Sequence, residues 1–488
     1  MILPSMRNLH RLIVSSACLL LLTGCASYRN KNLDHRLQVF ESPELRLKGV
    51  KNVQSREGQN PDIALALAIS GGGHRAANFA TGILLGMEST PLPGSGRDML
   101  QEVDYFSTVS GGGFASGAYL AALHDHIKSN SSEDFSLREA LLANKERGLY
   151  NLRRDYQTSM LVQWIHPSCF GYRDAGNLME RRFDHYLLGS KYRSDGSSLL
   201  LGDIFKRASS PDPVRLPYWI ANATVYENGA RFMFAPEFIA HYRIDRYTHK
   251  MRYHNLKGDP LSLPAAVGMK ASASFPVLFP ATTFTCTPEE DKLNPYLHLI
   301  DGGMTDNTGV KTALELLRND AAPRKILLVI DAYAKNAHPY SSYRTSPDGA
   351  GVAFRIMKIG LDAEHLRLRK EVSRQASENS IEVRFLGFDQ LKPVLQESIS
   401  DLKTEIAAMR KERTEALSRR LRREMDWALR KKRLELETVE SESENLYEDA
   451  RNVATTLSIT KAEQSVLLKT GQAVINRNKS DLTDLLKP

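Results

Sequence analysis

Apolar stretches recur along the chain from residue 63 onward, and glycine, serine or aspartate ends several of them. A continuous apolar stretch is typical of a strand that is buried on both faces of a parallel sheet. We therefore expect six strands, at residues 63–70, 103–110, 217–226, 296–303, 325–333 and 381–388. A helix is expected at 74–88, and a second helix runs to about residue 126. Strands that alternate with helices predict an α/β domain whose mainly parallel sheet is covered on both faces.

Residues 391–451 show a different pattern. Half of residues 401–450 are charged, against 25% for the whole chain. Apolar residues spaced four and three apart form a narrow helical seam at Leu395, Ile399, Leu402, Ile406 and Met409. We predict a charged helical hairpin inserted near the C-terminus. Three roles stay open for it: a solvated projection, a coiled coil that binds a partner or a second copy, or a basic strip facing a membrane.

The tail, residues 452–488, returns to an amphipathic pattern at 457–478. Thr460 followed by Glu463 has the spacing of a capping box, in which each side chain bonds the backbone of the other residue. We expect a helix that begins there and docks back on the main domain.

The first 24 residues are predicted to be a secretory signal. Arg7 and Arg11 precede a short apolar run, Leu12 to Leu22, that is too short to span a membrane. The ending LTGC resembles a bacterial lipobox, which implies cleavage before Cys25 and acylation of that cysteine. Residues 25–60 are polar and read as a lipidated tether. Ala26 after Cys25 resembles outer-membrane sorting, so we expect a lipid-anchored protein of the outer membrane that faces the periplasm.

Composition narrows the possible functions of the protein only slightly. The chain has 488 residues and a formal net charge of +8, which suits an anionic membrane surface as well as a nucleic acid. Beyond the signal and the anchor, two cysteines remain, Cys169 and Cys286, and the sequence does not decide whether they form a disulfide. No CxxC pair suggests a zinc site.

Two glycine trios carry the candidate chemistry: Gly71 to Gly73 after the first strand and Gly111 to Gly113 after Ser110. A dinucleotide site is a weak reading, because the second strand closes on Ser110 rather than on an acidic residue. A phosphate-binding P-loop is not supported by any motif. A Ser-His-Asp esterase is a second reading, in which Ser110 occupies a sharp strand-to-helix turn and His338 is the histidine.

A third reading rests on four motifs in order: SGGGHRAANFATG (70–82), STVSGGG (107–113), ASASFPVLFPA (271–281) and LIDGGMTDNTGV (299–310). Together they resemble the patatin-like phospholipase family, over about residues 60–390. The resemblance implies a three-layer α/β/α catalytic domain at 61–390 that cleaves acyl esters of phospholipids or lysophospholipids. Its substrate is a membrane lipid, with no nucleic acid, metal or cofactor implied.

The resemblance assigns a Ser-Asp dyad. Ser110 attacks the ester, and Asp301 takes the serine proton, which requires no histidine. If their two strands are parallel, both residues end at the same edge of the sheet. Gly71, Gly72 and Gly73 are expected to donate amides to the developing oxyanion. Arg75 either steadies this loop or holds the lipid phosphate. The rival classes are a lipid-binding protein without strong activity and an envelope factor that works through the hairpin.

Overall fold

The computed structural model describes most of the chain after residue 59. The described residues are 60–129, 134–142, 148–156, 175–208, 216–235, 238–239, 243–246, 249–252, 261, 263–276, 279–285, 296–334, 349–415 and 419–487. The expected signal, the tether with Cys25, both remaining cysteines and His338 lie outside these residues.

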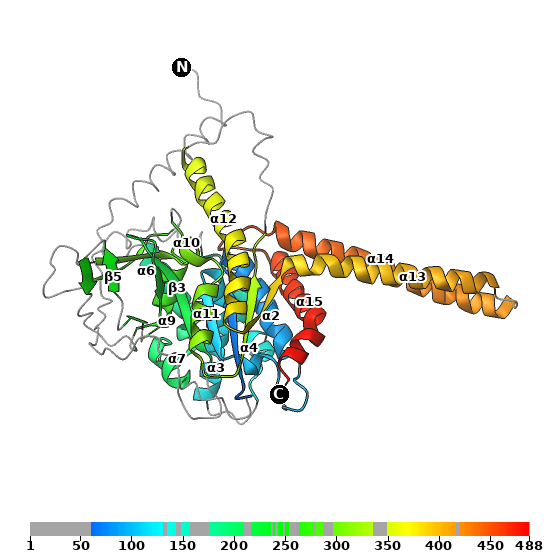
Figure 1. Ribbon diagram of the computed structural model, residues 1–488, viewed down its shortest axis with the longest axis horizontal. Helices are drawn as coiled ribbons and strands as arrows, with labels where there is room; N and C mark the ends of the chain where they lie inside the picture. The colour runs from blue at the N-terminus through cyan, green and yellow to red at the C-terminus, as the bar shows by residue number, and fades with distance from the viewer. Residues whose placement is uncertain are drawn as a thin grey trace, which may run out of the picture.

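A mixed sheet forms the centre of the domain (Figure 1). Its order is β10-β9-β1-β2-β3-β8-β7, and β4 also pairs with β3. The strands from β10 to β3 are mutually parallel, whereas β8, β7 and β4 are antiparallel to their neighbours. The bounds are β1 Ile63–Ile69, β2 Tyr105–Val109, β3 Tyr218–Val225, β4 Arg231–Met233, β7 Thr282–Thr285, β8 Tyr296–Asp301, β9 Arg324–Asp331 and β10 Ile381–Gly387. A separate two-stranded ribbon pairs β5 Arg243–Arg246 with β6 His249–Arg252.

The six expected strands are therefore all present, each within two residues of its expected ends. The pattern missed β4, β7 and the two strands of the ribbon, β5 and β6, which are only three or four residues long. Strands this short carry too few apolar positions to show a period, so their pairing with neighbouring strands decides their structure.

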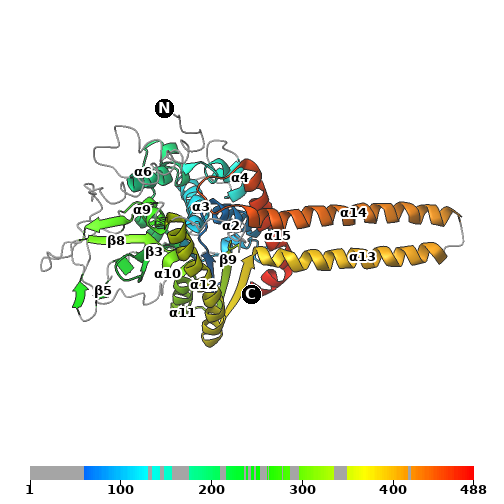
Figure 2. The same ribbon diagram turned by 90° about the horizontal axis from the view of Figure 1, so that it is seen from above.

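Helices cover both faces of the sheet, and the view from above separates the three layers (Figure 2). One face carries α2 Gly73–Glu88, α3 Gly111–Lys128 and α9 Ala265–Ser272, while α11 Val310–Asn319 and α12 Gly349–Glu378 lie on the other. The remaining helices are α4 Leu137–Leu142, α6 Ala175–Arg182, α7 Leu201–Ala208, α10 Gly303–Asp306, α13 Leu391–Glu415, α14 Arg419–Asn452 and α15 Lys461–Leu485.

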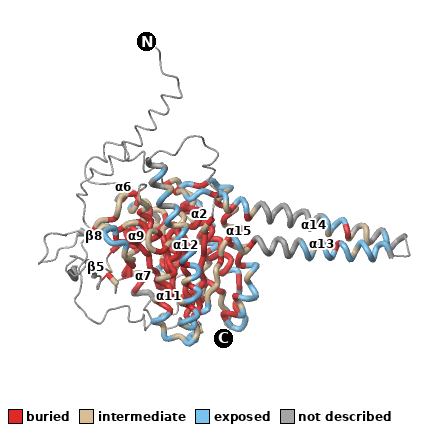
Figure 3. The backbone as a smooth tube through the Cα atoms, turned by 45° about the horizontal axis from the view of Figure 1, so that its top comes forward, coloured by how far each residue is buried: buried red, intermediate tan, exposed pale blue. Residues whose placement is uncertain are grey.

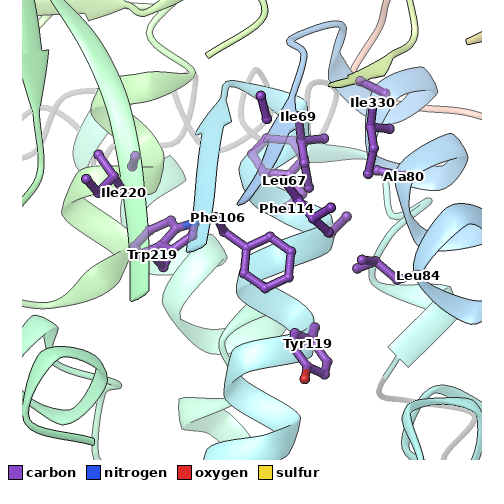
Figure 4. Packing of buried hydrophobic residues seen from close by; sticks show 14 of the residues in the cluster. Leu67, Ile69, Ala80, Leu84, Phe106, Phe114, Tyr119, Trp219, Ile220 and Ile330 are labelled. Carbon is purple, nitrogen blue, oxygen red and sulfur yellow. The ribbon is translucent and has the colours of Figure 1, made fainter. Parts of the chain in front are cut away.

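Buried apolar side chains from β1, β2 and β3 meet those of α2 and α3 beneath the sheet (Figure 4). Phe106 of β2 packs edge-on against Tyr119 of α3, with ring centroids 5.8 Å apart. Because every residue of β1 and β2 is buried, these strands form a rigid platform for whatever follows their carboxyl ends.

The tail helix α15 packs along α2 (Figure 1). The approach is so close that a Cβ at Gly82 or at Gly471 would overlap the backbone of the other helix. The expected capping box at Thr460 and Glu463 is confirmed by both of its hydrogen bonds. Helix α15 thus belongs structurally to the layer that carries α2.

Helices α13 and α14 run side by side away from the domain as a long hairpin (Figure 3). Ion pairs link the two helices, Arg413 to Asp426 and Lys432 to Glu405, the latter at 3.0 Å. Among the described residues, no helix is long and apolar enough to cross a membrane.

Candidate active site

Ser110 lies on the sharp turn between β2 and α3. Its φ of 49° and ψ of −122° fall in a region that side chains rarely adopt, so the surrounding structure must hold it there. Gly112 lets α3 begin directly beneath β1, since a Cβ there would lie 2.6 Å from the Ile69 carbonyl oxygen. The Ser110 amide donates to Ser272 Oγ at 2.9 Å. The half-buried serine is thus held in place by two helices, α3 and α9.

Asp301 reaches the neighbourhood of Ser110 at the end of a strand that runs against the direction of β2 and β3. The condition of parallel strands is not met, because β8 runs antiparallel to β3. β3 extends beyond the end of β2, and Asp301 pairs with Ala223 while Val109 pairs with Asn222. The carboxyl end of β8 therefore arrives at the level where β2 ends, from the opposite direction.

Gly302 then turns the chain away, so close to β3 that a Cβ would overlap the Asn222 carbonyl oxygen. The segment after α9 fixes this end of β8, because the Asp301 amide donates to the Ser274 carbonyl at 2.9 Å. Ser272 and Ser274 thus fix the positions of Ser110 and Asp301 relative to one another. Their role was missed, since only the ASASFP motif marked them.

The Asp301 side chain is almost fully buried, at 2% exposure. Burial raises its pKa from the ordinary 3.8 to about 7, while the Gly303 amide and the Ser110 side chain oppose that rise. Oδ1 accepts the Gly303 amide at 2.7 Å. Oδ2 has no hydrogen-bond partner among the described residues, and the serine hydroxyl beside it does not complete one. A buried, unused carboxylate oxygen next to a serine is suited to accept its proton.

The glycine loop lies against the nucleophile. A Cβ at Gly71 would stand 3.4 Å from Ser110 Cβ and 2.5 Å from Asn307 Oδ1. The Gly71 amide already donates to the Asn307 carbonyl at 2.9 Å, so its expected role as an oxyanion donor does not fit. Gly72 and Gly73, with φ of 141° and 57°, donate to no atom of the described residues outside α2. Their amides are the candidate donors.

Arg75 is buried behind this loop rather than exposed at the helix surface. It donates to the Val453 carbonyl at 3.2 Å and lies near Asp331, and burial lowers its pKa to about 10. The preceding turn is held in the same way, since the His74 amide donates to the Thr456 carbonyl at 2.8 Å. Two roles were expected for Arg75, and these contacts fit the first, in which it steadies the loop. It does so by binding the segment between α14 and α15.

Other residues of the motifs shape the site. Asp306 accepts the amides of Thr308, Gly309 and Lys311 and so caps the start of α11. Thr108 accepts a 3.1 Å hydrogen bond from the Trp219 indole. Cys25 and His338 lie outside the described residues, so the anchor and the triad stay predictions.

Comparisons with known proteins bear on the family of the domain. The family described as patatin-like phospholipase matches residues 67–314, slightly more than half of the chain. No curated protein matches. Nine chains among the solved structures match, and one of them is the human GIVD cytosolic phospholipase A2, at 12% identity and a TM-score of 0.28. That match covers 56% of this chain and 46% of the human chain, less than half of its length. On the extent of the family match, this chain belongs to the patatin-like phospholipase family.

Proposed function

We propose that this protein hydrolyses fatty-acyl esters of phospholipids or lysophospholipids, with Ser110 as the nucleophile and Asp301 as the base. Family membership supports a lipid acyl hydrolase in general. The observation that carries the finer assignment is the buried Oδ2 of Asp301, which has no partner among the described residues and lies beside a serine on a strained turn.

In the first half of the reaction, Ser110 Oγ bonds to the ester carbonyl carbon while its proton passes to Asp301 Oδ2. Negative charge develops on the carbonyl oxygen. The Gly72 and Gly73 amides, at the N-terminus of α2, and the N-terminus of α3 supply positive potential for it. As the tetrahedral species collapses, the bond to the leaving alcohol breaks, and Asp301 returns its proton to that oxygen.

In the second half, water attacks the acyl group on Ser110 and gives its proton to Asp301. The fatty acid leaves, and the serine recovers its hydrogen. A base with a pKa near 7 suits both halves, because it accepts and releases a proton near neutral pH.

We further propose that acylated Cys25 holds the domain at the outer membrane, facing the periplasm. The LTGC sequence and Ala26 support this placement, which would keep the domain close to its substrate. The lipid label can be read directly by mass spectrometry of the N-terminal peptide, and a Cys25→Ala chain that kept its lipid would refute the anchor.

The activity is tested by fatty-acid release from defined phospholipids and lysophospholipids. Ser110→Ala and Asp301→Asn are expected to lose at least about a hundredfold in rate. Ser129→Ala, at the far end of the same helix α3, is the matched control and is expected to keep full activity. If His338→Ala loses as much as Asp301→Asn, the triad replaces the dyad. If no acyl ester is cleaved, the result favours one of the two rival functions: a lipid-binding protein, or an envelope factor that works through the hairpin.

A further inference from the structure

Helix α12 is much longer than the strand that follows it. It has 30 residues and spans about 45 Å, whereas β10 has seven residues and spans about 23 Å. Because β9 and β10 are parallel, α12 must run back from the carboxyl edge of the sheet to its amino edge. The extra length extends past one of these edges.

Contacts at mid-helix show which edge it is. His365 Nε2 lies 3.2 Å from Oδ2 of Asp331, the last residue of β9. Lys311 Nζ lies 3.3 Å from Glu364 and donates to the carbonyl of Thr305, in the short helix α10 that follows Asp301. The N-terminal residues 349–361, about 20 Å of helix, therefore continue beyond the carboxyl edge, on the side where Ser110 and Asp301 lie. Figure 1 shows this half of α12 rising above the sheet.

The composition of the helix changes at the same place. The half that packs on the domain is charged, with ion pairs such as Glu364 to Arg367 and Glu371 to Arg374. The projecting part, residues 349–361, holds two basic residues, Arg355 and Lys358, and no acidic one. Its other side chains are mostly apolar.

Apolar side chains on this helix are exposed in a single stripe. Of the seven large hydrophobic residues that are exposed among the described residues, four lie on α12: Val352 at 39%, Ile356 at 64%, Ile359 at 51% and Leu366 at 58%. At about 100° per residue they fall within an arc of roughly 80°. The buried residues His365, Leu368 and Val372 occupy the opposite face. The stripe is therefore a second apolar face, separate from the one that packs on the domain.

We propose that this stripe, Val352, Ile356, Ile359 and Leu366, enters the surface of an anionic lipid bilayer and holds the Ser110 edge of the sheet against it. The inference rests on the proposed lipid hydrolase function and adds the surface by which the domain meets its substrate. Apolar side chains on a projecting helix with basic residues are the features that bind membrane interfaces. Three of its four residues, Val352, Ile356 and Ile359, lie on the projecting part, at the end of the domain that carries the reactive serine.

Insertion is tested with the full chain reconstituted in vesicles of phosphatidylethanolamine and phosphatidylglycerol. Ile356→Trp places a fluorophore on the stripe, and Leu142→Trp places one on another exposed apolar position, 57% exposed on α4. Lipids brominated in the acyl chain are expected to quench the first tryptophan and not the second, after subtraction of the three native tryptophans. Equal quenching at both positions, or none at Ile356→Trp, overturns the proposal.

The consequence for activity is tested with Ile356→Asp combined with Ile359→Asp, against Leu142→Asp. The double variant is expected to cleave vesicle phospholipid about tenfold more slowly or worse, and a soluble short-chain ester at the wild-type rate. The control should change neither rate. Unchanged vesicle hydrolysis overturns the proposal. So does a change of oligomeric state without quenching of Ile356→Trp, because that result would show that the stripe binds a second copy of the chain. If the wild type cleaves no ester, the proposed function fails, and the quenching result still shows whether the stripe enters the bilayer.

Discussion

Replacing Asp301 with asparagine removes a buried charge and keeps the shape of the side chain. Asparagine retains an oxygen that can accept the Gly303 amide, which is the hydrogen bond that Oδ1 makes within the described part of the chain. What changes is the ability to ionise. Wild-type Asp301 has a pKa raised from 3.8 to about 7, mainly because burial disfavours the carboxylate.

The sign and size of the effect on stability follow from this pKa. Well below pH 3.8 the carboxyl is neutral in both folded and unfolded chains, so it costs nothing. Between pH 4 and pH 7 only the unfolded chain ionises, and wild-type stability falls as the pH rises. Above pH 7 the loss is constant. Three pKa units correspond to about 4 kcal/mol, so Asp301→Asn is expected to be more stable than wild type by up to about that amount at pH 8.

Thermal unfolding of both chains at pH 4.5 and pH 8 measures this difference. The asparagine chain should melt several degrees higher than wild type at pH 8, with most of the gain gone at pH 4.5. Exposed Asp195 is the control: hydrogen bonds from Ser197 lower its pKa, so Asp195→Asn should gain no stability at pH 8. The activity of wild type should rise through pH 7 as Asp301 ionises, while Asp301→Asn stays inactive at every pH. If Asp301→Asn is less stable than wild type at pH 8, burial does not raise the pKa of this carboxyl in the way described here.

Three further predictions concern the turn, the loop and the hairpin. Ser110→Gly should abolish hydrolysis and raise the free energy of unfolding by about 1 kcal/mol, because glycine adopts the positive φ without strain; lower stability in a melt would contradict this. Gly73→Ala should cost at least about a hundredfold in rate and also stability, since its Cβ would overlap the Thr456 carbonyl oxygen at a φ of 57°; a fully active, equally stable variant would remove the loop from the mechanism. Breaking the exposed ion pair of Arg413 and Asp426 should change stability by less than about 1 kcal/mol in a double-mutant cycle, and a larger coupling would show that the hairpin depends on it.

The strands and the turn at Ser110 were predictable because local pattern determines them. β1 is a continuous apolar run and β2 a mostly apolar one, each is followed by a serine and a glycine trio, and every residue in the two strands is buried. The direction of β8 was not predictable in this way, because an apolar run reads the same in either direction. Only the pairing of Asp301 with Ala223 shows that a strand from the opposite direction brings the carboxylate to the serine.

Contacts between distant segments also escaped the sequence. Nothing near Gly71 indicates that its amide is already bound by Asn307, or that Val453 and Thr456 would grip the loop from the end of the hairpin. Such bonds depend on where loops meet after the sheet has formed. The exposed stripe on α12 was missed for a related reason. An apolar residue in a helix predicts burial, and only the excess length of α12 shows that part of it extends beyond the domain.

The most direct test is to identify the residue that carries the acyl group or its mimic. The protein would be treated with a long-chain alkyl fluorophosphonate, which reacts with activated serines, and digested with trypsin. The label is expected on Ser110 in the peptide of residues 98–128, and to be lost in Ser110→Ala and greatly slowed in Asp301→Asn. A label on Ser107, Ser116 or a serine of another peptide, with unchanged hydrolysis by Ser110→Ala, would contradict the assignment of the nucleophile.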